Sequence, residues 1–218
     1  MNEGNEVTFK TGKISSLIAG ICTVLFALFI LLGFTTDTIM FQFLVCFVLA
    51  ISYVVAANAV CSATSPEMKI WGRLTVSFAV MYAIFICFVY YTQLTVVRLN
   101  LISADSLALI KMSPGAWLFA LDMLGYTFLA LSTVFAAFLF SKKGLERKIR
   151  VMMIIHSVLG IPACLIPALP LFSGEQAVQS ASFGGALALL GWCIVFAPVC
   201  FLLARYFSLN GAKKAQSV

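Results

Sequence analysis

One acidic side chain lies deep inside an apolar stretch of this sequence. Asp122 follows Pro114 by eight residues, which is about 12 Å along a helix, while the other acidic residues lie outside the apolar stretches or near their ends. An ionised aspartate at the centre of a membrane helix costs roughly 2.5–3.5 kcal/mol on insertion scales. Asp122 is therefore expected to face other helices, where it binds a ligand, relays a proton or is paired in a buried polar network.

Polar residues on two predicted helices have spacings that place them near Asp122. Tyr126 follows it by four residues, on the same helical face. Tyr90 and Gln93 share one face of the preceding long helix, and Tyr90 is expected at the depth of Asp122. These positions predict an outward-opening polar pocket between the third and fourth long helices. Its candidate ligand-binding residues are Asp122, Tyr126, Tyr90, Tyr91, Gln93 and Arg98.

Secondary candidates are His156, the only histidine, and Asn58, which is expected at a similar depth near the other end of the bundle. A lone histidine is no zinc site, because zinc needs three or four protein ligands. No serine-nucleophile motif accompanies it. The seven cysteines are isolated and indicate small buried apolar residues. We therefore expect no metal and no cofactor, and a packing role for His156 is favoured over a proton relay.

Composition determines which elements must position these residues. Apolar residues make up 62% of the chain and charged residues only 10%, which excludes a water-soluble globule. The apolar runs are continuous and long enough for helices, which need about 20 residues to cross the hydrocarbon core. The sequence predicts an all-α membrane protein, a six-helix transmembrane bundle forming a single domain over residues 1–218. The predicted spans are 14–34, 39–62, 70–97, 114–140, 149–172 and 183–207.

Orientation follows from the positive charges. All lysines and arginines except Arg98 and Lys111 fall on one side of the predicted spans. Because such residues favour the cytoplasmic side, both termini are expected in the cytoplasm, in the inner (cell) membrane. The external connection at 98–113 is either a plain loop or a short interfacial helix that follows an N-cap at Ser103.

Partners are expected to be membrane lipids. The net charge of +6 lies at helix ends, so no nucleic-acid partner is expected. A cationic cluster is either a plain topology signal or a site for anionic headgroups. The cluster consists of Lys142, Lys143, Arg147, Lys148 and Arg150. The sequence leaves open whether the chain forms a homo-oligomer.

Two segments carry a resemblance to other proteins. Residues 90–98 (YYTQLTVVR) and 120–126 (ALDMLGY) resemble those of uncharacterised small multi-pass membrane proteins of bacteria and archaea. The resemblance covers the third to fifth spans and implies that these segments belong together, but it brings no activity and no catalytic residue.

Three functions remain open at this stage. The favoured one is binding or translocation of a small amphipathic ligand or lipid, with Asp122 as the charge or proton partner. A membrane enzyme acting on lipid is less favoured, because it needs a second titratable group and only His156 or Arg98 is available. The third is a structural or regulatory subunit without a ligand site.

Overall fold

Six long helices dominate the computed structural model, which describes residues 3–169 and 175–216, with side chains described for 6–169 and 184–212. Within this part of the chain, six stretches are long and apolar enough to cross a membrane, and no residue forms a strand. The predicted all-α membrane bundle is therefore confirmed. The six stretches are Glu6–Leu32, Ile39–Ala63, Pro66–Val97, Trp117–Ala137, Gly144–Ala168 and Gly184–Ala212.

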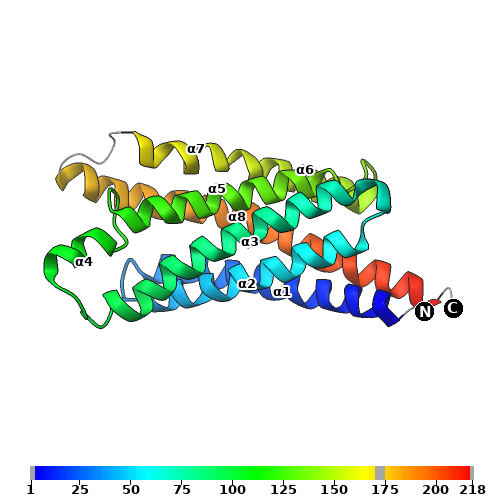
Figure 1. The fold of residues 1–218 in the computed structure, drawn as a ribbon, viewed down its shortest axis with the longest axis horizontal. Coiled ribbons are helices and arrows are strands. Elements are labelled where there is room, and N and C mark those ends of the chain that lie inside the picture. Colours follow the sequence, from blue (N-terminus) through cyan, green and yellow to red (C-terminus); the bar gives the residue numbers. More distant parts are fainter. Residues whose placement is uncertain (1–2, 170–174, 217–218) are drawn as a thin grey trace.

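The helices are labelled in chain order in Figure 1. They are α1 (Glu3–Leu32), α2 (Ile39–Ala63), α3 (Lys69–Thr92), α4 (Ala104–Ile110), α5 (Trp117–Ala137), α6 (Gly144–Val158), α7 (Gly160–Leu165) and α8 (Glu175–Gln216). A 3₁₀ turn, η1 (Pro66–Met68), precedes α3, a π-helical turn, η2 (Gln93–Val97), continues it, and a second 3₁₀ turn, η3 (Ile166–Ala168), follows α7.

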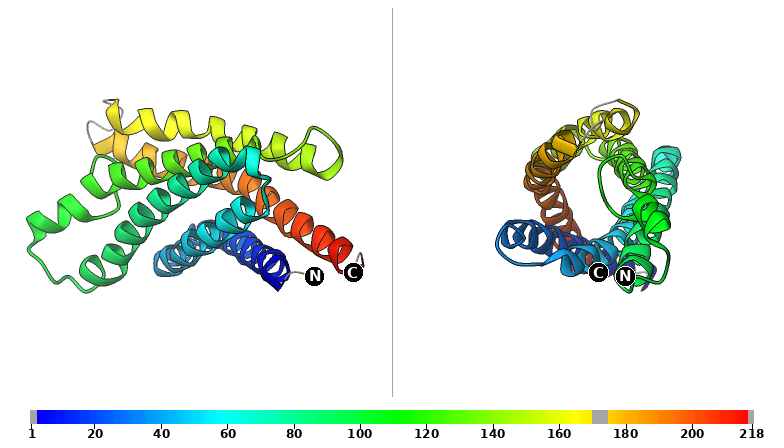
Figure 2. Two further views of the ribbon diagram at one scale, coloured as in Figure 1. Left: turned by 45° about the vertical axis from the view of Figure 1, so that its right-hand side comes forward. Right: turned by 90° about the vertical axis from the view of Figure 1, so that its left-hand side faces the viewer.

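The long helices pack in a ring. Going round it, α1 contacts α2, α2 contacts α3, α3 contacts α5, α5 contacts α6, and α6 contacts α8, which returns to α1. The end-on view in Figure 2 shows this arrangement. A ring of this kind gives every long helix one face toward the interior, where a polar side chain can avoid lipid.

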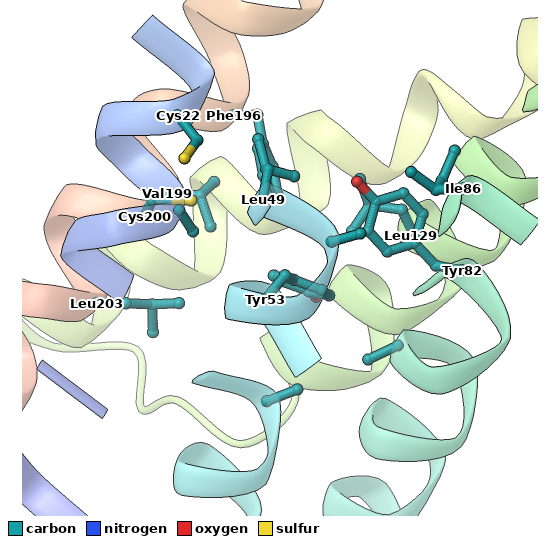
Figure 3. Close-up of a cluster of buried hydrophobic side chains, with 14 of the residues drawn as sticks. Cys22, Leu49, Tyr53, Tyr82, Ile86, Leu129, Phe196, Val199, Cys200 and Leu203 are labelled. Atoms are coloured by element: carbon teal, nitrogen blue, oxygen red, sulfur yellow. The ribbon is translucent and has the colours of Figure 1, made fainter. Parts of the chain in front are cut away.

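Side chains from opposite sides of the ring fill the interior. Cys22 of α1, Leu49 of α2, Tyr82 of α3, Leu129 of α5 and Phe196 of α8 are all buried and belong to one cluster (Figure 3). Apolar side chains on the outer faces stay exposed along every long helix, as expected of a surface that lipid covers.

Two helices extend well beyond their predicted spans. The first starts at Glu3 rather than near 14, and the last continues to Gln216 rather than ending near 207. These extensions pack on each other, because a Cβ at Gly211 would lie 3.3 Å from Cβ of Phe9, and Phe9 also meets Phe207 edge to face with ring centroids 6.2 Å apart. Hydropathy predicts only the lipid-crossing part of a helix, so helix–helix contacts beyond it were not visible in the apolar run.

The fifth predicted span is not one continuous helix. It divides into α6 and α7, with Leu159 between them. Pro162 has no N–H to donate to the carbonyl of Val158, four residues earlier, which accounts for the interruption of the helix. Pro167 lies in the 3₁₀ turn η3, and Pro170 lies outside the described residues.

The last helix contains a proline and several glycines. Pro198 lies inside α8 without ending it. Gly184, Gly185 and Gly191 do not mark a close helix contact, because a Cβ at any of them would have no atom of a neighbouring element within 4 Å in the described part of the chain.

The two ends of the bundle differ in charge. The starts of α1, α3 and α6 and the end of α8 lie at one end (Figure 1), and these segments carry the cations that the sequence groups together. Arg98 and Lys111 flank α4 at the opposite end. Of the two alternatives for the connection at 98–113, a short helix is present as α4, with the Ser103 side chain accepting the N–H of Ser106.

Candidate ligand-binding site

The site begins with a close approach of α3 and α5 beside Asp122. Gly125 permits this approach, because a Cβ there would lie 3.0 Å from Cδ1 of Ile86. The helix faces that carry Asp122 and Tyr90 are both buried. On α5 the buried face includes Asp122, Tyr126, Leu129 and Thr133, and along α3 and η2 it includes Tyr82, Ile86, Tyr90 and Gln93.

Asp122 lies in this interface with only 3% of its surface exposed. The hydroxyl of Tyr90 lies close to the carboxyl group, but Oδ1 has no hydrogen-bond partner among the described residues. A buried polar group left without a partner costs about 1–3 kcal/mol, and more when it is charged. Oδ1 is thus an acceptor that the described part of the chain leaves free.

Two tyrosines lie beside Asp122. The hydroxyls of Tyr90 and Tyr126 are 3.2 Å apart, and either of them can be the donor. A hydrogen bond from Tyr90 to the carboxylate would make Tyr126 the donor of this pair. The thiol of Cys46 on α2 lies beside the same three groups.

Aromatic rings enclose these polar groups. Phe43 of α2 stacks on Tyr90 with centroids 5.3 Å apart, and Trp192 of α8 meets Tyr126 edge to face at 5.3 Å. Tyr82 lies 6.2 Å from Tyr126 between ring centroids. An acid surrounded by aromatic rings suits a cation, because the ring faces carry negative electrostatic potential.

The site is closed in this structure, in contrast to the predicted outward-opening pocket. Tyr90 and Asp122 are each 3% exposed and Tyr126 is 7% exposed. Gln93 does not point its amide at Asp122. Its Nε2 donates to the carbonyl of Ile110 at 2.6 Å, and its Oε1 accepts the N–H of Met112 at 3.1 Å.

Gln93 therefore fastens the end of α4 to the π-helical turn of α3. We expect Gln93→Leu to detach the end of α4 from the π-helical turn, because the carbonyl of Ile110 and the N–H of Met112 both lose their hydrogen-bond partner. Hydrogen–deuterium exchange should rise at the amides of residues 104–112 and stay unchanged in α1. Thr95→Ala is the matched control in the same turn, since its hydroxyl bonds only to Tyr91 of its own helix. Equal exchange in both variants would contradict this role.

Three of the predicted residues lie apart from Asp122. Tyr91 is 61% exposed, because it is next to Tyr90 on the helix and so points about 100° away from it. Arg98 is exposed at the outer end of the π-helical turn. Asn58 is also exposed and donates to the carbonyl of Val54 on its own helix at 2.9 Å, so it is not a partner of His156.

His156 lies in a second buried polar cluster, nearer the cationic end. Nε2 accepts the indole N–H of Trp192 at 2.9 Å, and Nδ1 is 2.9 Å from the hydroxyl of Thr133. Because an indole can only donate, Nε2 carries no proton and the ring is neutral with its proton on Nδ1. The hydroxyl of Thr133 then accepts a hydrogen bond from this N–H and donates one to the carbonyl of Ala130 at 2.9 Å. Every polar atom of this cluster has a partner, which is typical of a packing role.

Trp192 was not predicted as a site residue, although it contacts both clusters. Its ring meets Tyr126 and its N–H binds His156. An indole in the middle of an apolar run is a buried donor that needs an acceptor, and this was the signal available in the sequence. Cys46 had no comparable signal, because nothing distinguishes it from the other isolated cysteines.

The described residues offer no metal-binding group of three or more His, Cys, Asp or Glu side chains. Their cysteines are all free thiols. The two buried clusters therefore contain one carboxyl oxygen without a hydrogen-bond donor and one histidine whose two ring nitrogens both have partners.

Comparison with known proteins finds no match to a family model, to a curated protein or to a solved structure.

Proposed function

We propose that this integral membrane protein binds a small amphipathic ligand through a protonated amine, and that Asp122 is its charge partner. The observation that carries the proposal is the free Oδ1 of a carboxyl group that is buried among helices. Among the described residues, the only other buried side-chain oxygen without a partner is the hydroxyl oxygen of Ser16, which carries no charge, and the cluster around His156 is fully hydrogen-bonded. An acid retained at such a cost is typical of a functional site in a membrane protein.

The surroundings favour an ammonium group as the ligand's polar end. Oδ1 requires a donor, and the rings of Phe43, Tyr90, Tyr126 and Trp192 favour a positive charge. The apolar remainder of the ligand would contact the same rings. A lipid-modifying enzyme is less well supported, because Arg98 is exposed and both nitrogens of His156 are occupied.

The same charge distribution supports an orientation. We infer that the end formed by the starts of α1, α3 and α6 faces the cytoplasm, because lysine and arginine near helix ends favour that side. The protein would then lie in the cell (inner) membrane, and α4 would lie at the outer surface, next to the ligand site.

Asp122→Asn tests the proposal without changing the size of the side chain. We expect the variant, free of ligand, to be at least as stable as the unsubstituted protein, since it removes an ionisable group from a buried position. Melting temperatures are then measured with n-alkylammonium ions from butyl to octyl. These probes should raise the melting temperature of the unsubstituted protein by several degrees and leave that of Asp122→Asn unchanged.

Two controls separate the ligand site from other effects. Asp105→Asn removes an exposed acid on α4 and should respond to alkylammonium ions as the unsubstituted protein does. The corresponding n-alcohols carry no charge and should have a weaker effect. An equal response in Asp122→Asn, or a large loss of stability in that variant without ligand, would show that Asp122 serves packing instead.

A further inference from the structure

A groove lies far from Asp122, between the start of α6 and the last part of α8. Its volume is about 1020 Å³. Its cationic lining residues are Arg147, Lys148 and Arg205, and its apolar ones include Val151, Met152, Pro198, Phe201 and Leu202. The groove therefore combines a cationic part with an apolar part, which suits a ligand that has both an anionic group and an apolar group.

The charges and apolar groups are arranged by depth. The first turn of α6 carries Arg147 and Lys148, and Val151 follows one turn farther along. On α8, Phe201 precedes Arg205 by one turn. Because α6 leaves the cationic end of the bundle and α8 returns to it (Figure 1), the cations of both helices meet at the mouth. The apolar residues of both helices then line the inner part of the groove.

The three cations are available for an external anion. Among the described residues, none of their side chains forms an ion pair or a hydrogen bond. The acid in the same turn, Glu146, already accepts the N–H of Ser141 at 2.8 Å. The mouth also includes Gly144 at the start of α6, where the helix dipole adds partial positive charge.

The neighbouring cations of the basic cluster have other positions. Arg150 donates to the carbonyl of Phe140 at 3.1 Å, and its guanidinium lies 5.6 Å from the ring centre of Phe138. Lys142 and Lys143 are exposed in the connection before α6 and do not line the groove. Of the five clustered cations, only Arg147 and Lys148 line the groove, together with Arg205 from a distant part of the sequence.

We propose that this groove binds one anionic glycerophospholipid. The phosphate would lie between Arg147, Lys148 and Arg205, where arginine can donate two parallel hydrogen bonds to phosphate oxygens. An acyl chain would lie along Val151 and Phe201, which are 43% and 38% exposed. A lipid fits better than free phosphate, because free phosphate would leave the apolar part of the groove empty. The site is separate from Asp122 and does not depend on the function proposed there.

Native mass spectrometry of the full-length protein provides the test, with dioleoyl phosphatidylglycerol titrated into delipidated samples. We expect one lipid to be retained in preference to phosphatidylcholine. Arg147→Gln/Arg205→Gln should weaken this binding by about 25-fold, from roughly fivefold for each cation near a membrane surface. Lys142→Gln/Lys143→Gln removes the same charge outside the groove and should change the binding less than threefold.

A third variant tests the apolar part without changing any charge. Val151→Trp fills the groove and should also weaken phosphatidylglycerol binding at least fivefold. Millimolar inorganic phosphate should not displace the lipid. Equal losses in the two charge variants would overturn the proposal in favour of unspecific surface attraction, and so would unchanged binding in Val151→Trp. Displacement by inorganic phosphate would overturn it in favour of a simple anion site. Melting temperatures and gel-filtration profiles confirm that each variant is folded.

Discussion

His156→Leu should destabilise the protein by about 1–3 kcal/mol, because it leaves the indole N–H of Trp192 without an acceptor in a water-free interior. Trp192 is 7% exposed and His156 is 1% exposed, so no solvent replaces the lost bond. The hydroxyl of Thr133 also loses its donor, although it still donates to Ala130. The free energy of unfolding, measured by SDS titration in mixed micelles, gives the size of the effect.

A second substitution tests the cause of this loss. Trp192→Phe in the His156→Leu background removes the orphaned donor, and we expect it to restore part of the stability. Strictly additive losses in the double variant would show that the bond between Trp192 and His156 is not the reason. Asn58→Leu is the control for a polar residue of similar length on an exposed face, where the change should stay within about 0.5 kcal/mol.

The second large effect is expected at the junction between α6 and α7. A Cβ at Gly160 would lie 2.4 Å from Cβ of Ala130, well inside the contact distance of two carbon atoms. Neither atom can rotate away, because a Cβ is fixed to its backbone. Gly160→Ala must therefore push α7 away from α5, and we expect a loss of about 1–3 kcal/mol, measured by the same titration.

The chain offers a matched control for this substitution. Gly191→Ala makes the same chemical change inside α8, where nothing lies within 4 Å of the new Cβ, and alanine favours a helix over glycine by about 1 kcal/mol. Its stability should be unchanged or slightly higher. Ala130→Gly removes the opposing Cβ, so Gly160→Ala should cost much less in an Ala130→Gly background than in the unsubstituted protein. An equal cost of Gly160→Ala in both backgrounds would contradict the steric explanation.

The inward face of each helix could be predicted from periodicity alone. Asp122, Tyr126 and Thr133 share one face of α5, and all are buried as expected. The prediction was weaker where two helices had to be aligned with each other. Gln93 has the spacing of a site residue, but its amide reaches the backbone after α4 instead. Helical spacing specifies a direction around the axis and says nothing about which neighbouring group a flexible side chain reaches.

The sequence by itself determined that the protein lies in lipid, that it has six long helices and that most of its lysines and arginines lie at one end of the bundle. These properties follow from composition and from the length of each apolar run, which are local quantities. Only the tertiary structure showed that Asp122 keeps a free acceptor while His156 has none, and that Arg205 joins Arg147 and Lys148 around one groove. Each of these results depends on contacts between helices that are distant in the chain. In a sequence so rich in apolar residues, many different helix pairings would bury similar surface, so the specific contacts decide the sites.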